Sequence, residues 1–131
     1  MSGSADRWIT FAAEDLHAAQ ILFAGGVWNQ ACFHAQQCVE KTLKGLIVRL
    51  GKVAPPRTHS VAELLEALPA GWFGELRTEL RDALDDYYIP TRYPDALPGT
   101  LPDGLPGCDE AKEAVSLAER ALAEARCRIT A

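Results

Sequence analysis

The stretch YYIPTRYPD, residues 87–95, combines one arginine and one aspartate with three tyrosines and two prolines. Proline ends a helix and sets a bend, so we expect Arg92 to be displayed in a turn rather than on a helix face. A guanidinium can hold two oxygens of a phosphate at once, but it stays protonated and cannot transfer a proton. The alternative is a structural ion pair of Arg92 with Asp95, Asp15 or another acid, which would hold this loop against the rest of the chain.

Two tyrosines beside this arginine, Tyr88 and Tyr93, have two interpretations. Aromatic rings stack on bases in nucleotide sites and single-strand sites. More often, such tyrosines belong to a core or an interface and have a bonded hydroxyl, and we favour this second interpretation.

A second polar set recurs at steps of three and four residues and consists of Gln30, His34, Gln37, Lys41 and Lys44. In a helix this spacing stacks the side chains along one face, where they could line a groove for a phosphate and the edge of a base. A polar seam at a helix–helix or dimer contact is the other interpretation. His59 is expected to belong to the cap of the following helix rather than to a site.

Asp15 stands inside an apolar stripe that runs along the first helical segment. Burial of a carboxylate is costly unless the group is paired or faces an opening. We therefore expect Asp15 to pair with His34 or Arg92 if the first two helices pack side by side.

Apolar residues recur at helical spacing in five segments that would position these groups. The first runs from Asp6 to Phe23 and ends at Gly25-Gly26, and the second runs from about Trp28 to Leu50. Nothing alternates at period two over a useful length. The predicted fold is therefore all-α, an antiparallel bundle of four long helices plus one short helix.

The other three segments follow a loop after Gly51. Ser60 begins the short helix, with Glu63 at the position that completes a capping box. The fourth helix is expected to carry residues 72–87 and must stop before Pro90. Asp109 can cap the last helix. A single domain is expected over residues 5–130, after a flexible lead at residues 1–4 and with a Pro/Gly-rich loop at residues 96–107.

The charge of the chain bears on its partners. The formal net charge of −5 argues against broad, nonspecific binding to DNA or RNA. From Lys41 to His59 there are five basic residues and no acid, which indicates either a local anion site or a solvated helix face.

The four cysteines contain no CxxC pair, so neither a zinc site nor a disulfide framework is predicted. They are most simply small buried apolar groups. No apolar run approaches the roughly 20 residues that span a bilayer. We expect a cytoplasmic protein that needs no metal or cofactor.

Four stretches in this order resemble a HEPN domain, namely WITFAAEDLHA, ACFHAQQCVEKTLKGLI, THSVAELL and YYIPTRYPD. The resemblance covers nearly the whole chain. It implies a helical bundle that usually forms homodimers and is often paired with a minimal nucleotidyltransferase in toxin–antitoxin or related modules. The active branch of the family is a metal-independent endoribonuclease with an arginine, four to six residues, and then a histidine. Two such motifs meet across the dimer.

The nuclease motif is incomplete in this chain. Arg92 matches the family arginine, but the positions where the histidine could fall are Leu97, Pro98 and Gly99. None of these side chains can move a proton near neutral pH, as an imidazole can. Arg57 and His59 are too close together to replace the motif.

We therefore favour a protein that binds a nucleotide or an RNA phosphate without cleaving RNA by itself and that acts through a partner. The candidate binding residues are Asp15, His34, Gln37, Lys41, Lys44, Arg92, Tyr93 and Asp95. The alternatives are a ribonuclease that uses His34 or His59 in place of the missing histidine, and a dimeric scaffold for protein interaction.

Overall fold

The computed structural model describes residues 3–51, 54–88 and 104–130, and within these ranges it contains helices and no strand. The elements are α1 (Ser4–Ala24), α2 (Trp28–Gly51), α3 (Val61–Glu66), α4 (Leu76–Leu84), the short 3-10 helix η1 (Asp85–Tyr87) and α5 (Cys108–Thr130). The predicted all-α fold is confirmed. Among the helices described, none combines the length and the apolar composition that crossing a membrane would take.

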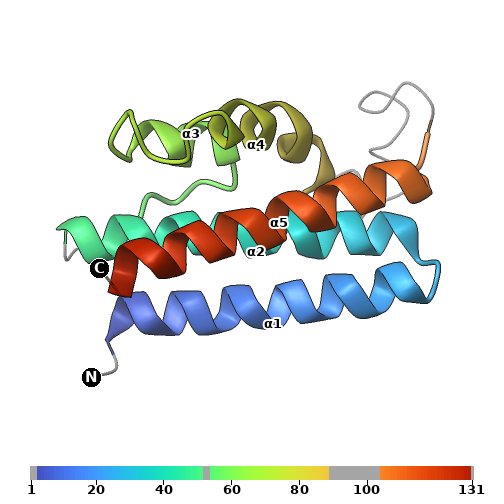
Figure 1. Cartoon of the computed structure of the whole chain (residues 1–131), viewed down its shortest axis with the longest axis horizontal. Helices are drawn as coiled ribbons and strands as arrows, with labels where there is room; N and C mark the ends of the chain where they lie inside the picture. The colour runs from blue at the N-terminus through green and yellow to red at the C-terminus, as the bar shows by residue number, and fades with distance from the viewer. Residues whose placement is uncertain (1–2, 52–53, 89–103, 131) are drawn as a thin grey trace.

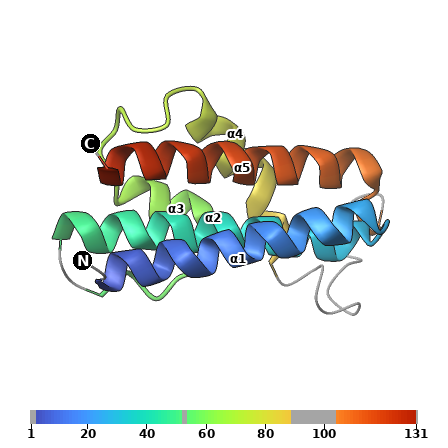
Figure 2. The same cartoon turned by 60° about the horizontal axis from the view of Figure 1, so that its bottom comes forward.

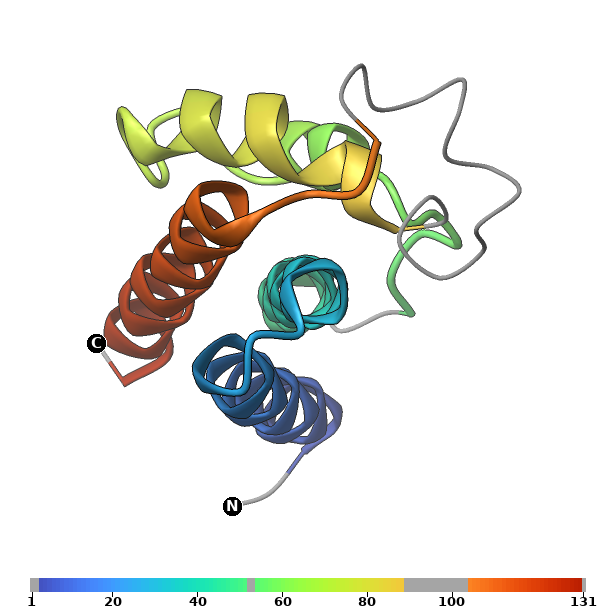
Figure 3. The same ribbon diagram turned by 90° about the vertical axis from the view of Figure 1, so that its right-hand side faces the viewer.

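Three long helices form the frame of the molecule. Helices α1, α2 and α5 lie alongside one another in two views (Figures 1 and 2). Helix α1 is antiparallel to both α2 and α5, and these two run in the same direction (Figure 1). Seen end-on, α3 and α4 cover α2 and α5 on the side away from α1 (Figure 3). Helix α2 is therefore the one that is enclosed by elements on opposite sides.

Helix α2 is central in the bundle, and its buried side chains include both apolar and polar residues. It packs against α1, α3, α5 and η1, and Val39, Leu43 and Leu46 are buried within these contacts. Gly45 permits a close approach of α1, since a Cβ at this position would lie 3.1 Å from the Cβ of Trp8. The close packing of α1 on α2 is what brings the polar residues of the two helices together.

The predicted fourth helix is shorter than its apolar pattern suggested. Phe73 and Gly74 have φ angles of 72° and 49°, which is left-handed backbone that a right-handed helix does not contain. The N–H of Phe73 donates to Oε2 of Glu124 on α5 at 2.6 Å, although the Phe73 ring is buried as a helix position would be. The helix therefore begins at Leu76, and the described bundle has three long and two short α-helices rather than four and one.

The start of α3 has the predicted Ser60 cap but not the complete capping box, since the N–H of Ser60 donates to Oγ1 of Thr58 at 3.1 Å and not to Glu63. The Oγ of Ser60 accepts a hydrogen bond from the N–H of Glu63 at 3.2 Å. Asp85, at the start of η1, also accepts from the N–H of Val61 at 2.5 Å. The side chain of Asp85 thus joins the end of α4 to the beginning of α3, where it bonds residues 60–62.

The start of α5 differs from the prediction. The helix begins at Cys108, so Asp109 lies in its first turn and does not cap it. Glu110 instead accepts a hydrogen bond from the N–H of Gly107 at 2.8 Å. Of the predicted loop at residues 96–107, only residues 104–107 belong to the described part of the chain, and they are not helical.

Candidate functional site

Asp15 on α1 holds two residues of the polar face of α2. Its Oδ1 accepts a hydrogen bond from Nδ1 of His34 at 2.9 Å, and its Oδ2 accepts from Nζ of Lys41 at 2.5 Å. His34 and Lys41 are two helical turns apart and so share one face of α2. The expected pairing of Asp15 with His34 is observed, and Lys41 is a second partner that was not predicted.

Two opposing effects act on the Asp15 carboxyl. Burial is the largest and by itself would raise the pKa. The hydrogen bonds and positive charges of His34 and Lys41 outweigh it together and hold the pKa below its usual range. Asp15 is therefore an ionised carboxylate that fixes an imidazole and an ammonium at the α1–α2 seam.

Glu40 is the centre of a second cluster, on a neighbouring face of α2. Its carboxylate accepts hydrogen bonds from Nζ of Lys44 at 2.9 Å and from Nδ1 of His59 at 3.1 Å. The Glu40 side chain is only 5% exposed, whereas that of His59 is 57% exposed. Glu40 was not predicted as a site residue, and His59 was named only in the ribonuclease alternative. In the sequence, the spacing of four residues between Glu40 and Lys44 could have predicted this ion pair. The same spacing is common on solvated helix faces, so it did not indicate that the pair is buried.

Gln37 belongs to the Glu40 cluster. Its Nε2 donates to Oε1 of Gln36 at 2.7 Å and to Oε1 of Glu40 at 3.2 Å. Gln36 is buried and donates in turn to the backbone carbonyl of His59 at 3.1 Å. The structure therefore divides the predicted set: His34 and Lys41 contact Asp15, while Gln37 and Lys44 contact Glu40.

A series of aromatic rings connects the two clusters. The ring of Phe33 lies 5.2 Å from that of His34 and 6.0 Å from that of Tyr88, measured between centroids. Tyr88 in turn stacks on His59 with a centroid distance of 4.2 Å and an interplanar angle of 12°. The His34 end of the Asp15 cluster and the exposed end of the Glu40 cluster thus belong to one continuous region.

Two basic residues of the segment from Lys41 to His59 form ion pairs within the fold. Lys41 pairs with Asp15, and Lys44 forms an ion pair with Glu40 in which the lysine side chain is 9% exposed. Arg49 donates to the backbone carbonyl of Ile129 at 3.0 Å. Lys44 is thereby placed below the surface, where its ammonium does not join that of Lys41.

Three predicted site residues, Arg92, Tyr93 and Asp95, lie outside the described residues. Tyr88 is the last described residue before them, and it contacts Phe33 beside His34. The chain therefore enters the segment that carries Arg92 from the His34 end of α2.

The cysteines fall into two pairs. Cys32 and Cys38 are buried, and burial raises the pKa of each thiol to about 12. Cys108 and Cys127 are exposed, so the prediction of buried apolar cysteines holds for the first pair only. Within residues 3–51, 54–88 and 104–130, no group of three or more His, Cys, Asp or Glu side chains is arranged to hold a metal ion.

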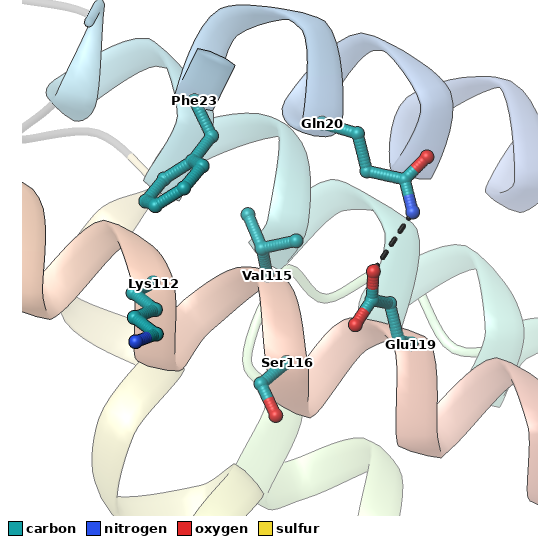
Figure 4. A pocket seen from close by; sticks show the side chains of 6 residues that line it. All are labelled: Gln20, Phe23, Lys112, Val115, Ser116 and Glu119. Carbon is teal, nitrogen blue, oxygen red and sulfur yellow. Dashed lines mark hydrogen bonds between the residues drawn. The ribbon is translucent and has the colours of Figure 1, made fainter.

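A hollow of about 280 Å³ lies elsewhere, between α1 and α5. Figure 4 shows its lining, in which Gln20 donates to Glu119 at 2.8 Å across the two helices, with Phe23 and Lys112 nearby. None of its lining residues belongs to the Asp15 or Glu40 cluster. We therefore treat these two clusters, and not the hollow, as the candidate site.

Comparison with known proteins identifies relatives over nearly the whole chain. The HEPN domain family matches residues 5–128. A protein of Methanocaldococcus jannaschii with the name "Putative toxin MJ1304" is 27% identical over 128 residues, which cover 90% of this chain and 83% of that protein.

Two solved structures share both the fold and part of the sequence. TT1696 from Thermus thermophilus superposes with a TM-score of 0.80 and 37% identity, covering 95% of this chain and 98% of that one. ST0689, named as an archaeal HEPN homologue, superposes with a TM-score of 0.69 and 31% identity, covering 98% and 99%. Because the family match spans almost the full length and the helical frame is shared, this protein is a member of the HEPN family.

Proposed function

We propose that this HEPN protein binds a nucleotide, or a phosphate of RNA, at the α1–α2 seam, and that it acts in a toxin–antitoxin-type module. The observation that carries the proposal is that Asp15 orients His34 and Lys41 side by side on one face of α2. Both side chains are partly exposed, so their polar groups are within reach of a ligand.

Lys41 is suited to a phosphate because an ammonium has three donors. One of them is directed to Asp15, which leaves two for phosphate oxygens. The Nδ1 of His34 is likewise directed to Asp15, so a ligand on this face would meet Nε2. Fixing both groups before binding lowers the conformational entropy that the ligand must overcome.

Arg92 supplies the net positive charge in this proposal. The charge of Asp15 offsets that of Lys41, so a phosphate needs a further cation, and a guanidinium matches its geometry. In the sequence Arg92 follows Tyr88 by four residues, with Tyr93 next to it and Asp95 available to orient it. These three assignments are sequence predictions that the proposal retains.

The module is proposed from family membership and from the name of the M. jannaschii relative. In this proposal the protein forms a homodimer and works with a partner such as a minimal nucleotidyltransferase. The family nuclease motif lacks its histidine after Arg92, so binding rather than cleavage is the function that we assign.

The Asp15–His34 bond favours one alternative, a ribonuclease with a non-standard histidine. A carboxylate bonded to Nδ1 of an imidazole is the arrangement that orients a general base. RNA incubated with the purified protein in EDTA would be cleaved by the wild type and not by the His34→Ala, His59→Ala double variant. Cleavage that survives in the double variant would indicate a contaminating nuclease.

Thermal unfolding with AMP tests the binding proposal. A ligand at a hundredfold excess over its Kd stabilises the native state by about 2.7 kcal/mol, so AMP should raise the Tm of the wild type. The shift should be lost in Arg92→Ala and in Lys41→Met. Arg81→Ala, a change at an exposed arginine of α4, serves as the matched control and should keep the shift. No shift in the wild type, with AMP or with a short RNA, would contradict the proposal.

A further inference from the structure

His59 and Tyr88 form a stacked pair at the surface next to α2. The ring centroids are 4.2 Å apart and the rings are inclined by 12°. Tyr88 covers one face of the imidazole, yet the His59 side chain is 57% exposed. Most of this exposed area therefore belongs to the opposite face and the edge of the ring.

The imidazole is held rigidly although it is exposed. Its Nδ1 donates to Glu40, a buried carboxylate that also accepts from Lys44. The backbone carbonyl of His59 accepts from buried Gln36, and the next residue, Ser60, begins α3. Because both the ring and the backbone are anchored, the exposed face of His59 keeps its position without a ligand.

Stacking holds Tyr88 and His59 together more than hydrogen bonding does. The Tyr88 hydroxyl lies 3.3 Å from Nε2 of His59, but the donor and acceptor directions of an imidazole nitrogen lie in the ring plane. A hydroxyl carried by a nearly parallel ring lies outside that plane. An amide side chain could make the bond to Glu40 equally well, so the ring of His59 supplies an aromatic face that the Glu40 network does not require.

We propose that His59, backed by Tyr88, is the platform on which the base of a bound nucleotide stacks. This inference rests on the proposed function, since it assigns the base to the nucleotide whose phosphate meets Lys41. Phe33 contacts both His34 and Tyr88, so the platform is continuous with the anion-binding face. Stacking of one base on an aromatic side chain strengthens binding by roughly ten- to a hundredfold.

Isothermal titration of the full chain with AMP and with ribose 5-phosphate tests the platform. The two probes share the sugar and the phosphate, and only AMP has a base. The wild type should bind AMP about ten- to a hundredfold more tightly than ribose 5-phosphate. His59→Gln, which keeps a donor for Glu40 and loses the ring, should bind the two probes equally and leave the affinity for ribose 5-phosphate unchanged.

Two further variants separate the ring from its hydrogen bonds. His59→Phe keeps an aromatic face without the bond to Glu40, and Tyr88→Phe keeps the stack without the hydroxyl. Both should retain the preference for AMP. Thermal unfolding of each variant checks that it is folded.

Each other result has a definite meaning. Equal binding of AMP and ribose 5-phosphate by the wild type would overturn the platform and leave the proposed function standing. A preference for AMP that persists in His59→Gln would also overturn the platform. If neither probe binds, the platform fails, and if a short RNA also leaves the Tm unchanged, the proposed function fails with it.

Discussion

Asp15 and Glu40 each hold one histidine and one lysine, but they present these partners to solvent in opposite ways. At Asp15, His34 is 31% exposed and Lys41 is 28% exposed. At Glu40, the lysine is buried and the histidine is open to solvent. A carboxylate, an imidazole and an ammonium therefore make a cluster with two accessible polar groups at Asp15, and a buried ion pair with one accessible ring at Glu40.

This difference shows that burial of the lysine decides whether a cluster stabilises the fold or is available to bind a ligand. A buried ammonium must keep its counter-charge, because an unpaired charge away from water costs several kcal/mol. Lys44 is thus committed to Glu40 and to the stability of the fold. Lys41 is close to water, so a ligand can take part of its hydrogen bonding at little cost, and this is where we expect function.

The largest effect is expected from removing the buried carboxylate. Glu40→Ala leaves Lys44 buried without its partner, and we expect the free energy of unfolding to fall by about 3–5 kcal/mol. Urea unfolding followed by circular dichroism measures this loss. The double variant Glu40→Met, Lys44→Met should recover most of it, since it leaves no unpaired charge. A loss below about 1 kcal/mol in the single variant would show that the pair is not buried in solution.

The two lysines allow a direct comparison by the same substitution. Lys44→Met should lower the free energy of unfolding by about 1–3 kcal/mol, because the buried Glu40 carboxylate loses its ammonium partner. Lys41→Met should change it by about 1 kcal/mol or less and should instead abolish the stabilisation by AMP. Urea unfolding of both variants measures the change in stability, and the thermal shift with AMP measures whether each variant still binds the ligand. The reversed order of stability, or a loss of AMP binding in Lys44→Met alone, would contradict the assignment of roles.

Asp15 should contribute to the pH dependence of stability in the acid range. Its pKa is lower in the folded chain than its ordinary value, so its ionised form stabilises the fold above the unfolded pKa. That contribution is lost as the pH falls through the folded pKa. Asp15→Asn should therefore have a lower Tm than the wild type at about pH 6, and the difference should shrink between about pH 4 and pH 2. A difference that stays constant on acidification would show that the carboxylate charge does not matter.

The smallest effect is expected at an exposed ion pair. Its change in unfolding free energy is the reference against which the loss at the buried Glu40–Lys44 pair is compared. Arg120 and Glu79 join α5 to α4 at 3.1 Å, and each side chain is about half exposed. Arg120→Ala should change the free energy of unfolding by less than about 1 kcal/mol. A larger loss, measured under the same urea conditions, would mean that surface pairs also contribute and that burial is not what distinguishes Lys44.

Much of the frame was predictable because helix formation follows local periodicity. The apolar spacing located α1, α2 and α5, and the spacing of His34 and Lys41 placed them correctly on one face of α2. The position of Asp15 inside an apolar stripe also predicted a partner, since an unpaired buried carboxylate is costly. The short fourth helix was not predictable in the same way, because the left-handed backbone at Phe73 is stabilised by Glu124, 51 residues away.

The sequence by itself determined which side chains share a helix face, because the 3.6-residue repeat sets that directly. Only the tertiary structure decided which of those faces is covered. Glu40 and Lys44 resemble an ordinary solvated pair until the segment at His59 and the α2 packing enclose them. The separation of a buried Lys44 from an accessible Lys41 depends on elements distant in sequence, and these elements set the burial and the partners of each charge.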